Sequence, residues 1–316
     1  MKVALIGGGD WGETWFRKLK AAPQVEFAGI WDASENVRSR WQARANVFPS
    51  FDAVFEAGKV DAAIICTPPD THTKLVETIL SNGMHALIEK PFGFHSEPVT
   101  RLFDLACRMQ KCLMVNFTFL YTPAFEALRE RAYGQWHEYN SLRLSPRKYF
   151  GNIHIIDDLV VHDLAMLVSL HDLLDPLRVR CELSGRESDA GLSFASVDLE
   201  APSFRARILA SCQWPWKRRD IALKTPTSTF AYDDSDPVEP LREYAREGSS
   251  LVLKSVIKTS RETGLDRVLS EFITRAHLGA YDKDRLLIKK INQLRAALHE
   301  SWQNSSRWVL AELAHE

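Results

Sequence analysis

The sequence predicts an α/β protein in which a doubly wound parallel sheet is followed by a C-terminal α+β domain with an open, mainly antiparallel sheet. A glycine-rich turn follows the first apolar run, and short apolar runs alternate with helix-period segments up to about residue 120. Several alternating runs come later in the chain. Because 316 residues exceed one ordinary hydrophobic core, we expect two domains, residues 1–120 and residues 121–316.

The glycine turn follows a predicted buried strand that ends at residue 6. It holds Gly7, Gly9 and Gly12 at Gly-x-Gly-x-x-Gly spacing, with Asp10 and Trp11 inside it. The first glycine permits a tight turn, the second lets backbone amides approach a pyrophosphate, and the third lets the next helix pack on the strand. The N-terminus of that helix, in WGETWFRKLKAA, attracts phosphate. The alternative is a glycine turn that holds no nucleotide.

The second predicted strand, in VEFAGIW, ends at Asp32, twenty residues after Gly12. A carboxylate in this place accepts hydrogen bonds from ribose hydroxyls and repels a 2′-phosphate. The next residues, Ala33 and Ser34, supply no cation. We therefore expect NAD as the cofactor, while Arg38 and the neighbouring Arg40 keep NADP possible.

The rest of the first domain is expected to alternate strands and helices. Strands are predicted in DAAIIC, HALIE and CLMVNF, and helices in FDAVFEAG, HTKLVETILSNG and EPVTRLFDLACRMQK. Six strands would complete the nucleotide-binding fold. Ligands of such sheets bind beyond the carboxyl ends of the strands, where TPPDTH (residues 67–72) and EKPFG (residues 89–93) both lie.

The second domain is expected to begin with a helix in AFEALRERAYG and a strand, followed by an apolar helix near residues 156–172. An antiparallel sheet of about five or six strands is predicted in LRVRCELSG, LSFASVDLEA, FRARILASCQW, RRDIALKT and STFAYDD. The tail from Pro240 is expected to be helical. Trp214 and Trp216 fit either a subunit interface or ordinary core packing.

Lys90 is the first candidate for chemistry. It directly follows a predicted buried strand at the cofactor edge, and Pro91 fixes the backbone after it. A lysine beside the cationic ring of an oxidised nicotinamide stays neutral more easily and acts as a base. The alternative is an exposed lysine in a strand-to-helix loop.

Asp158 and His162 are the second candidate. If residues 157–170 are helical, the two side chains lie four positions apart on one face, where a carboxylate orients an imidazole for proton transfer. The alternative is that Asp157 or Asp158 caps the helix and that the histidine is an interior one. Asp163 points to another face and is expected to be structural.

Composition excludes several partner classes. The chain has 40 Lys and Arg against 41 Asp and Glu, a formal charge of −1, so we expect neither a nucleic acid nor a membrane as partner. The sequence shows no signal peptide and no apolar run of spanning length, so we expect a cytoplasmic protein with a small-molecule substrate. Its five cysteines form no Cys-x-x-Cys pair, which predicts free thiols and no metal site.

The segments VALIGGGDWG, CTPPDTH, IEKPFG and DLVVHDL, in this order and at these intervals, resemble the Gfo/Idh/MocA family of oxidoreductases. The resemblance implies an N-terminal Rossmann domain and a C-terminal sheet domain used in a homodimer or homotetramer. It implies that Lys90 is the acid/base, and that Asp158 and His162 bind substrate hydroxyls and relay the proton. The further positions expected to bind the cofactor are Thr67, Pro68, His72 and Glu89, together with Lys90.

The sequence departs from the family pattern at a few positions. Phe119 and Leu120 stand where many members have arginine, and Ala165 stands where many have an acid. We expect NAD(P)-dependent hydride transfer between the nicotinamide and a hydroxyl or ketone carbon of a sugar or nucleotide sugar. The alternatives are a redox-neutral NAD-dependent glycosidase or epimerase, and a catalytically silent NAD-binding sensor or scaffold.

Overall fold

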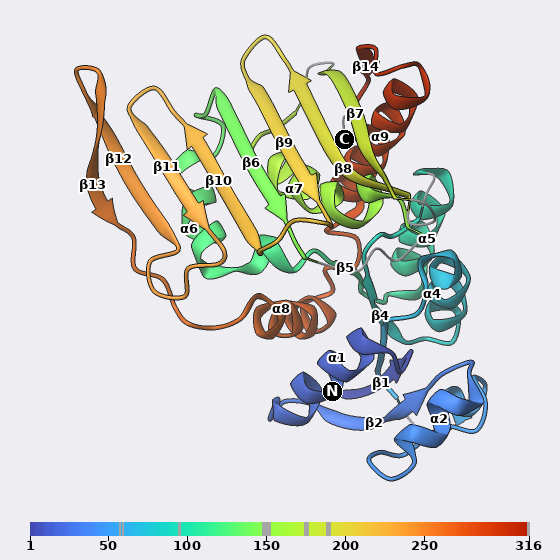
Figure 1. Cartoon of the computed structure of the whole chain (residues 1–316). Coiled ribbons are helices and arrows are strands. Elements are labelled where there is room, and N and C mark those ends of the chain that lie inside the picture. Colours follow the sequence, from blue (N-terminus) through green and yellow to red (C-terminus); the bar gives the residue numbers. More distant parts are fainter. Residues whose placement is uncertain are drawn as a thin grey trace. The chain divides into compact units, whose positions relative to one another are not determined.

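The chain folds into two compact units (Figure 1). The computed structural model describes residues 1–56, 58, 60–93, 96–146, 153–173, 177–187 and 191–314. The first unit combines Met1–Phe117 with Leu265–Arg285, and the second combines Thr118–Gly264 with Leu286–Glu316. The segment Leu265–Arg285 comes from the part of the chain that we expected in the second domain, and the domain boundary near residue 120 stays a prediction.

The first unit contains a five-stranded parallel sheet in the order β2-β1-β3-β4-β5. Its strands are β1 Lys2–Ile6, β2 Glu26–Trp31, β3 Ala62–Ile65, β4 His85–Glu89 and β5 Leu113–Asn116. Each of them was expected. Within the described residues the expected sixth strand is not part of this sheet, because the chain after β5 enters the second unit.

The strand order of the first unit reverses at β1, which has β2 on one side and β3 on the other. The crossover segments are α1 Asp10–Ala21, α2 Glu35–Trp41, α3 Ala53–Glu56, η1 Pro69–Thr71, α4 His72–Ser81 and α5 Ser96–Met109. Helix α2 was not expected; the Ser34 hydroxyl caps it by accepting from the Val37 N–H. The point of reversal is where sheets of this kind bind their ligands, beyond the carboxyl ends of the strands.

Helix α8 (Gly264–Leu278) and the residues after it complete the first unit. The Lys18 ammonium of α1 contacts both carboxylate oxygens of Asp266 at 2.8 Å. The carboxylate of Asp284 accepts from the Val115 N–H at 3.0 Å and pairs with Arg275 at 2.6 Å, and both members of this pair are buried. These contacts explain why a segment so late in the sequence belongs to the first unit.

The second unit contains a nine-stranded sheet in the order β13-β12-β11-β10-β6-β9-β8-β7-β14. Its strands are β6 Glu138–Leu144, β7 Leu177–Glu187, β8 Gly191–Glu200, β9 Arg205–Ser211, β10 Arg218–Lys224, β11 Ser228–Asp233, β12 Leu241–Glu247, β13 Ser250–Val256 and β14 Val309–Ala311. Strands β6 and β9 pair in parallel, and the other neighbours are antiparallel.

This sheet has more strands than the five or six that we expected. The tail from Pro240 does not begin as a helix: it forms the hairpin of β12 and β13. Gly248 adopts a φ of +61° in the connection, a left-handed conformation that lets the chain turn back on itself. The helical prediction is correct for α8 and α9, but it is wrong again for β14, which follows them and joins the sheet.

Helices cover one face of the nine-stranded sheet (Figure 1). They are α6 Pro123–Ala132, the π-helical turn η3 Ile156–Val160, α7 Val161–Ser169 and α9 Arg285–Gln303. On the other face side chains are open to solvent, as in β9, where exposed Arg205 and Arg207 alternate with buried Ala206 and Ile208. Among the described residues, none of the helices is long and apolar enough to cross a membrane.

Candidate active site

The glycine turn has the geometry that its sequence predicts. Gly7 adopts a φ of +105°, and a Cβ there would lie 2.8 Å from the carbonyl carbon of Cys66, the residue after β3. A Cβ on Gly12 would lie 2.2 Å from the carbonyl oxygen of Gly7, so only glycine lets α1 approach β1 this closely. A Cβ on Gly9 would meet nothing within 4 Å. The open position is the one at which a pyrophosphate was expected to approach the backbone.

Gly8 and Trp41 belong to the same turn and were missed. The indole N–H of Trp41 donates to the carbonyl oxygen of Gly8 at 3.1 Å, and a Cβ on Gly8 would lie 2.5 Å from that indole nitrogen. Trp41 is buried at the end of α2. This contact was not predicted from the sequence because Trp41 is positioned by α2, and α2 itself was not predicted.

Asp32 lies at the end of β2, beside the glycine turn. Its carboxylate accepts from the Gly8 N–H at 2.7 Å and from the Ser34 N–H at 2.8 Å. The guanidinium of Arg38 donates to the carbonyl oxygens of Asp32 at 2.7 Å and of Ala33 at 3.1 Å. The backbone N–H groups of Gly8 and Ser34 therefore fix the carboxylate at the position expected to bind a ribose. The guanidinium of Arg38 is directed toward carbonyl groups of the same loop.

The N-terminus of α1 points out of the glycine turn, and its N-cap Gly9 provides no side-chain cap. Asp10 and Trp11 lie in the first turn of this helix and are exposed, Trp11 by 41%. Uncapped N–H groups at a helix N-terminus favour an anion. Contact of the two side chains with a cofactor stays a prediction.

The loops after β3 and β4 are joined by His72. Its Nε2 lies 2.8 Å from the carbonyl oxygen of Thr67 and its Nδ1 lies 3.0 Å from that of Pro91. Burial lowers the pKa of this imidazole, which is fully enclosed. Thr67 is half-buried and Pro68 is exposed. His72 thus holds together the loops that carry Thr67 and Lys90, and direct contact of these residues with a cofactor stays a prediction.

Glu89 and Lys90 lie at the carboxyl end of β4. The buried Glu89 carboxylate accepts from the Trp15 indole and the Asn116 amide, each at 2.7 Å. Burial raises the pKa of Glu89, against the effect of these hydrogen bonds and of the Lys90 charge. Lys90 is half-buried, and its peptide bond to Pro91 is cis. Glu89 therefore connects α1, β4 and β5 at the position next to the candidate lysine.

Asp158 and His162 lie on either side of a change in helix type. The Val161 N–H donates to the Ile156 carbonyl, five residues earlier, so Ile156–Val160 forms a π-helical turn. The prediction of one regular helix over residues 157–170 is wrong for this turn, and α7 starts at Val161. Asp158 lies in the turn, His162 lies in the first turn of α7, and both are half-buried.

Asp163 has the structural role that we expected. It is fully buried and accepts from the hydroxyls of Tyr139 and Ser141 and from the guanidinium of Arg143, all in β6. Its carboxylate therefore fixes α7 to the sheet. The position of His162 follows from this anchor.

Phe119 lies against His162, with 4.9 Å between ring centroids in an edge-on arrangement. The guanidinium carbons of Arg143 and Arg219 lie 4.4 Å and 4.8 Å from the Phe119 ring centroid. The two arginines are directly opposite each other on β6 and β10. Arg219 also pairs with Asp234 at 3.0 Å. The guanidinium groups of Arg143 and Arg219 thus both lie against Phe119, the position at which the family resemblance implied an arginine.

These arginines were missed as site residues, although β6 carries a signal. Arg143 shares the buried phase of that strand with Tyr139 and Ser141. A buried arginine requires a partner, which was present in the sequence as Asp163. Lys90 lies in the first unit, and Asp158 and His162 lie in the second. Their meeting at one active site stays a prediction.

Comparisons with known proteins bear first on the N-terminal part of the chain. Residues 1–117 match the model of the GFO_IDH_MocA family, described as an oxidoreductase family with an NAD-binding Rossmann fold. UDP-N-acetylglucosamine 3-dehydrogenase from Acidithiobacillus ferrooxidans is 32% identical over 183 residues, which are 57% of either chain. Inositol 2-dehydrogenase from Rhizobium meliloti is 26% identical over 41% of this chain and 40% of its own length. The chain thus spans about half the length of these curated relatives.

Solved structures match over most of the chain. That of the Acidithiobacillus ferrooxidans UDP-N-acetylglucosamine 3-dehydrogenase superposes with a TM-score of 0.83 at 24% identity, covering 95% of this chain and 97% of the other. A 3-ketoreductase from Actinomadura kijaniata, solved with NADP and TDP-benzene, superposes with a TM-score of 0.80 at 17% identity over 95% and 97%. At this identity the superpositions show the fold. Over its first 117 residues the chain is thus similar to the Gfo/Idh/MocA family of oxidoreductases.

Proposed function

We propose that this protein is an NAD(P)-dependent oxidoreductase that transfers a hydride between C4 of the nicotinamide and a hydroxyl or ketone carbon of a sugar or nucleotide sugar. The observation that carries the proposal is the glycine turn, in which Gly12 permits close packing while Gly9 leaves open space. The dehydrogenases and reductases among the relatives support the same reaction class.

NAD is the preferred cofactor in this proposal. The carboxylate of Asp32, fixed by the N–H groups of Gly8 and Ser34, suits ribose hydroxyls and repels a 2′-phosphate. Arg38 donates from Nη1 to two backbone carbonyl oxygens of this loop, which favours a structural role for this arginine over binding of a 2′-phosphate. The pyrophosphate would lie against Gly9 and the N-terminus of α1.

Lys90, His162 and Asp158 are proposed to handle the proton that accompanies the hydride. The bound nicotinamide supplies or accepts the hydride, and Lys90 or His162 takes the hydroxyl proton in oxidation and returns it in reduction. Asp158 orients the imidazole of His162. Phe119 packs edge-on against the same ring and limits its rotation.

The substrate is proposed to carry an anionic group, as a nucleotide sugar does. Like charges placed directly opposite on neighbouring strands are destabilising, yet Arg143 and Arg219 occupy such a pair of positions. Asp163 and Asp234 offset part of this cost. A phosphate beside Arg219 would offset more of it and would form charge-assisted hydrogen bonds. UDP-N-acetylglucosamine, named for the relative at 32% identity, is the first compound to test.

We also propose that the enzyme acts in the cytoplasm as a homodimer or homotetramer. The free thiols of the chain are typical of a reducing compartment. Trp214 and Trp216 contact each other with 5.9 Å between ring centroids, and both are exposed, Trp216 by 57%. Core packing, one of the two interpretations given to these tryptophans, is therefore wrong, and an interface between subunits would cover them.

The test begins with fluorescence titrations of NADH and NADPH, each repeated with UDP-N-acetylglucosamine. Turnover is then followed by the absorbance of reduced nicotinamide. We expect NADH to bind more tightly than NADPH, and the Lys90→Ala variant to retain this binding while losing at least about a hundredfold in kcat. Lys74→Ala changes an exposed lysine of the same unit and serves as the matched control.

Three outcomes would overturn the proposal. Binding of neither cofactor would mean that the glycine turn holds no dinucleotide. Full turnover by Lys90→Ala would remove the proposed proton carrier. Substrate conversion without any net change in nicotinamide absorbance, in protein purified with its NAD, would replace hydride transfer by a redox-neutral reaction.

A further inference from the structure

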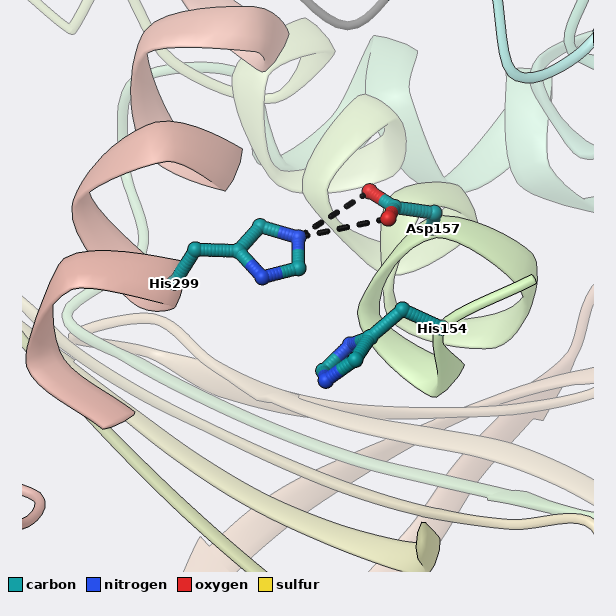
Figure 2. Close-up of side chains that lie close together, drawn as sticks. All are labelled: His154, Asp157 and His299. Atoms are coloured by element: carbon teal, nitrogen blue, oxygen red, sulfur yellow. Dashed lines mark hydrogen bonds and ion pairs between the residues drawn. The ribbon is translucent and has the colours of Figure 1, made fainter. Parts of the chain in front are cut away.

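His154, Asp157 and His299 form a cluster that the proposed reaction does not use (Figure 2). His154 precedes the π-helical turn, Asp157 lies in it, and His299 projects from α9, 142 residues farther along the chain than Asp157. One nitrogen of each imidazole and one carboxylate oxygen lie within 4.8 Å of one another. The sequence predicted no metal site, because ligands that come from such distant segments form no motif of short, regular spacing.

The separation of His299 and Asp157 suits two ligands of one cation. The Nε2 of His299 lies 3.2 Å from Oδ2 and 3.4 Å from Oδ1 of Asp157. A charge-assisted hydrogen bond is usually about 2.7–2.9 Å long. Two ligands at the usual distance from a tetrahedral zinc ion are about 3.4 Å apart. The observed contact is long for a hydrogen bond and right for a shared ion.

His154 is poorly satisfied by the protein around it. Its Nε2 is shielded from solvent and has no hydrogen-bond partner among the described residues, while its Nδ1 receives only a 3.3 Å contact from the Ile156 N–H. In His72, by contrast, both ring nitrogens contact carbonyl oxygens.

Arg295 orients the carboxylate of Asp157. Its Nε and Nη2 contact Oδ1 at 2.8 Å and 2.7 Å, and its Nη1 donates to the Asn292 side chain at 2.7 Å. Arg295 and Asp157 are both buried. The guanidinium binds Oδ1, so that Oδ2 stays directed toward His299. Residues that hydrogen-bond to metal ligands orient them in the same way. Its charge also opposes a cation, which weakens the expected affinity.

We propose that His154, Asp157 and His299 bind a divalent transition-metal ion, with zinc as the ion that fits best. Two imidazole nitrogens and one carboxylate match zinc far better than calcium or magnesium, which prefer all-oxygen ligands. Water completes the coordination. The ion links α9 to the π-helical turn that carries Asp158, and so it fixes the position of the N-terminus of α7.

The experiment uses the full-length protein, stripped with a chelator and then dialysed against Zn²⁺ or Co²⁺. We expect about one equivalent of zinc by elemental analysis, a rise in Tm on adding Zn²⁺, and visible absorption of bound Co²⁺. The His154→Ala and His299→Ala variants should lose all three responses. His277→Ala changes an exposed histidine outside the cluster and should keep them. Circular dichroism and Tm without metal verify that the variants fold.

Two results would overturn the proposal. One is wild-type protein that retains no more zinc than His154→Ala, which would leave Asp157 as the partner of Arg295 and His299 alone. The other is Co²⁺ absorption that survives in both folded histidine variants, which would place the ion elsewhere. If His299→Ala fails to fold, His154→Ala decides alone, because the pair of His299 and Asp157 stays intact in it.

Discussion

The candidate functional residues of the two units are held in place in different ways. In the first unit, backbone conformation forms the site: four glycines, the N-terminus of α1 and the end of β2 lie within the first 32 residues. In the second unit, side chains from β6, β10, η2 (Thr118–Tyr121) and α7 converge around Phe119. A backbone site leaves a motif in the sequence. A site of converging side chains leaves almost none, and it also depends on buried charges.

Breaking the buried charge of the second unit should have the largest effect. Asp163→Ala leaves the buried Arg143 without its carboxylate, and we expect a loss of about 3–5 kcal/mol in the free energy of unfolding. Urea denaturation measures it. The double variant Asp163→Ala/Arg143→Met should recover part of the loss, since no unpaired charge remains. Equal losses in the single and double variants would contradict this account.

In the first unit the two kinds of glycine can be separated. Gly12→Ala drives a Cβ against the backbone of Gly7. We expect the free energy of unfolding to fall by about 1–3 kcal/mol and NADH binding to be lost as well. Gly9→Ala meets open space and should leave stability within about 0.5 kcal/mol while weakening NADH binding about tenfold or more. Tm and fluorescence titration measure the pair. Unchanged NADH affinity in Gly9→Ala would place the pyrophosphate elsewhere.

Cofactor choice should depend on one carboxylate of the first unit. Asp32→Asn removes the charge that repels a 2′-phosphate but keeps an acceptor for the Gly8 N–H. The ratio of the Kd values for NADPH and NADH should fall about tenfold, which is about 1.4 kcal/mol. Glu35→Gln, an exposed acid nearby, is the control and should leave the ratio unchanged. A ratio unaffected by Asp32→Asn would assign the discrimination to Arg38.

A further prediction for the first unit concerns pH. Burial, aided by the charge of Lys111, lowers the pKa of His85 from 6.5 to about 4. The unfolded chain therefore takes up a proton below pH 6.5 that the folded first unit accepts only near pH 4, so stability falls as the pH falls through this window. His85→Asn keeps an acceptor for the Cys112 N–H and should flatten the fall in urea midpoint. His137→Asn, exposed in the second unit, should not.

The same contrast explains what the sequence could predict. All five strands of the first sheet, the tight turn at Gly7 and the close packing at Gly12 followed from short apolar runs and one motif. Helix α2 did not, because ENVRSRW carries little apolar periodicity and depends on Trp41 packing against Gly8. The arginine pair did not either, since strand pairing, rather than sequence distance, brings Arg143 to Arg219.

The π-helical turn shows a second limit. Hydrophobic periodicity locates a helix near residues 156–172, but a single wider turn leaves the apolar pattern almost unchanged. The metal-site candidate depends on this turn and on α9 together, so only the folded chain brings its ligands close. A sequence pattern describes neighbours along one element, and it does not tell which distant element lies opposite.

The late segment Leu265–Arg285 has a consequence for how the protein is made. Its contact from Val115 to Asp284 spans 169 residues of sequence. On a ribosome adding about 5–20 residues per second, the segment follows Phe117 by roughly 8–34 s. During that delay the nascent first unit has its strands but lacks α8, and the surface that α8 covers is open to chaperones. Completion of the nucleotide-binding unit thus waits for translation of almost the whole second unit.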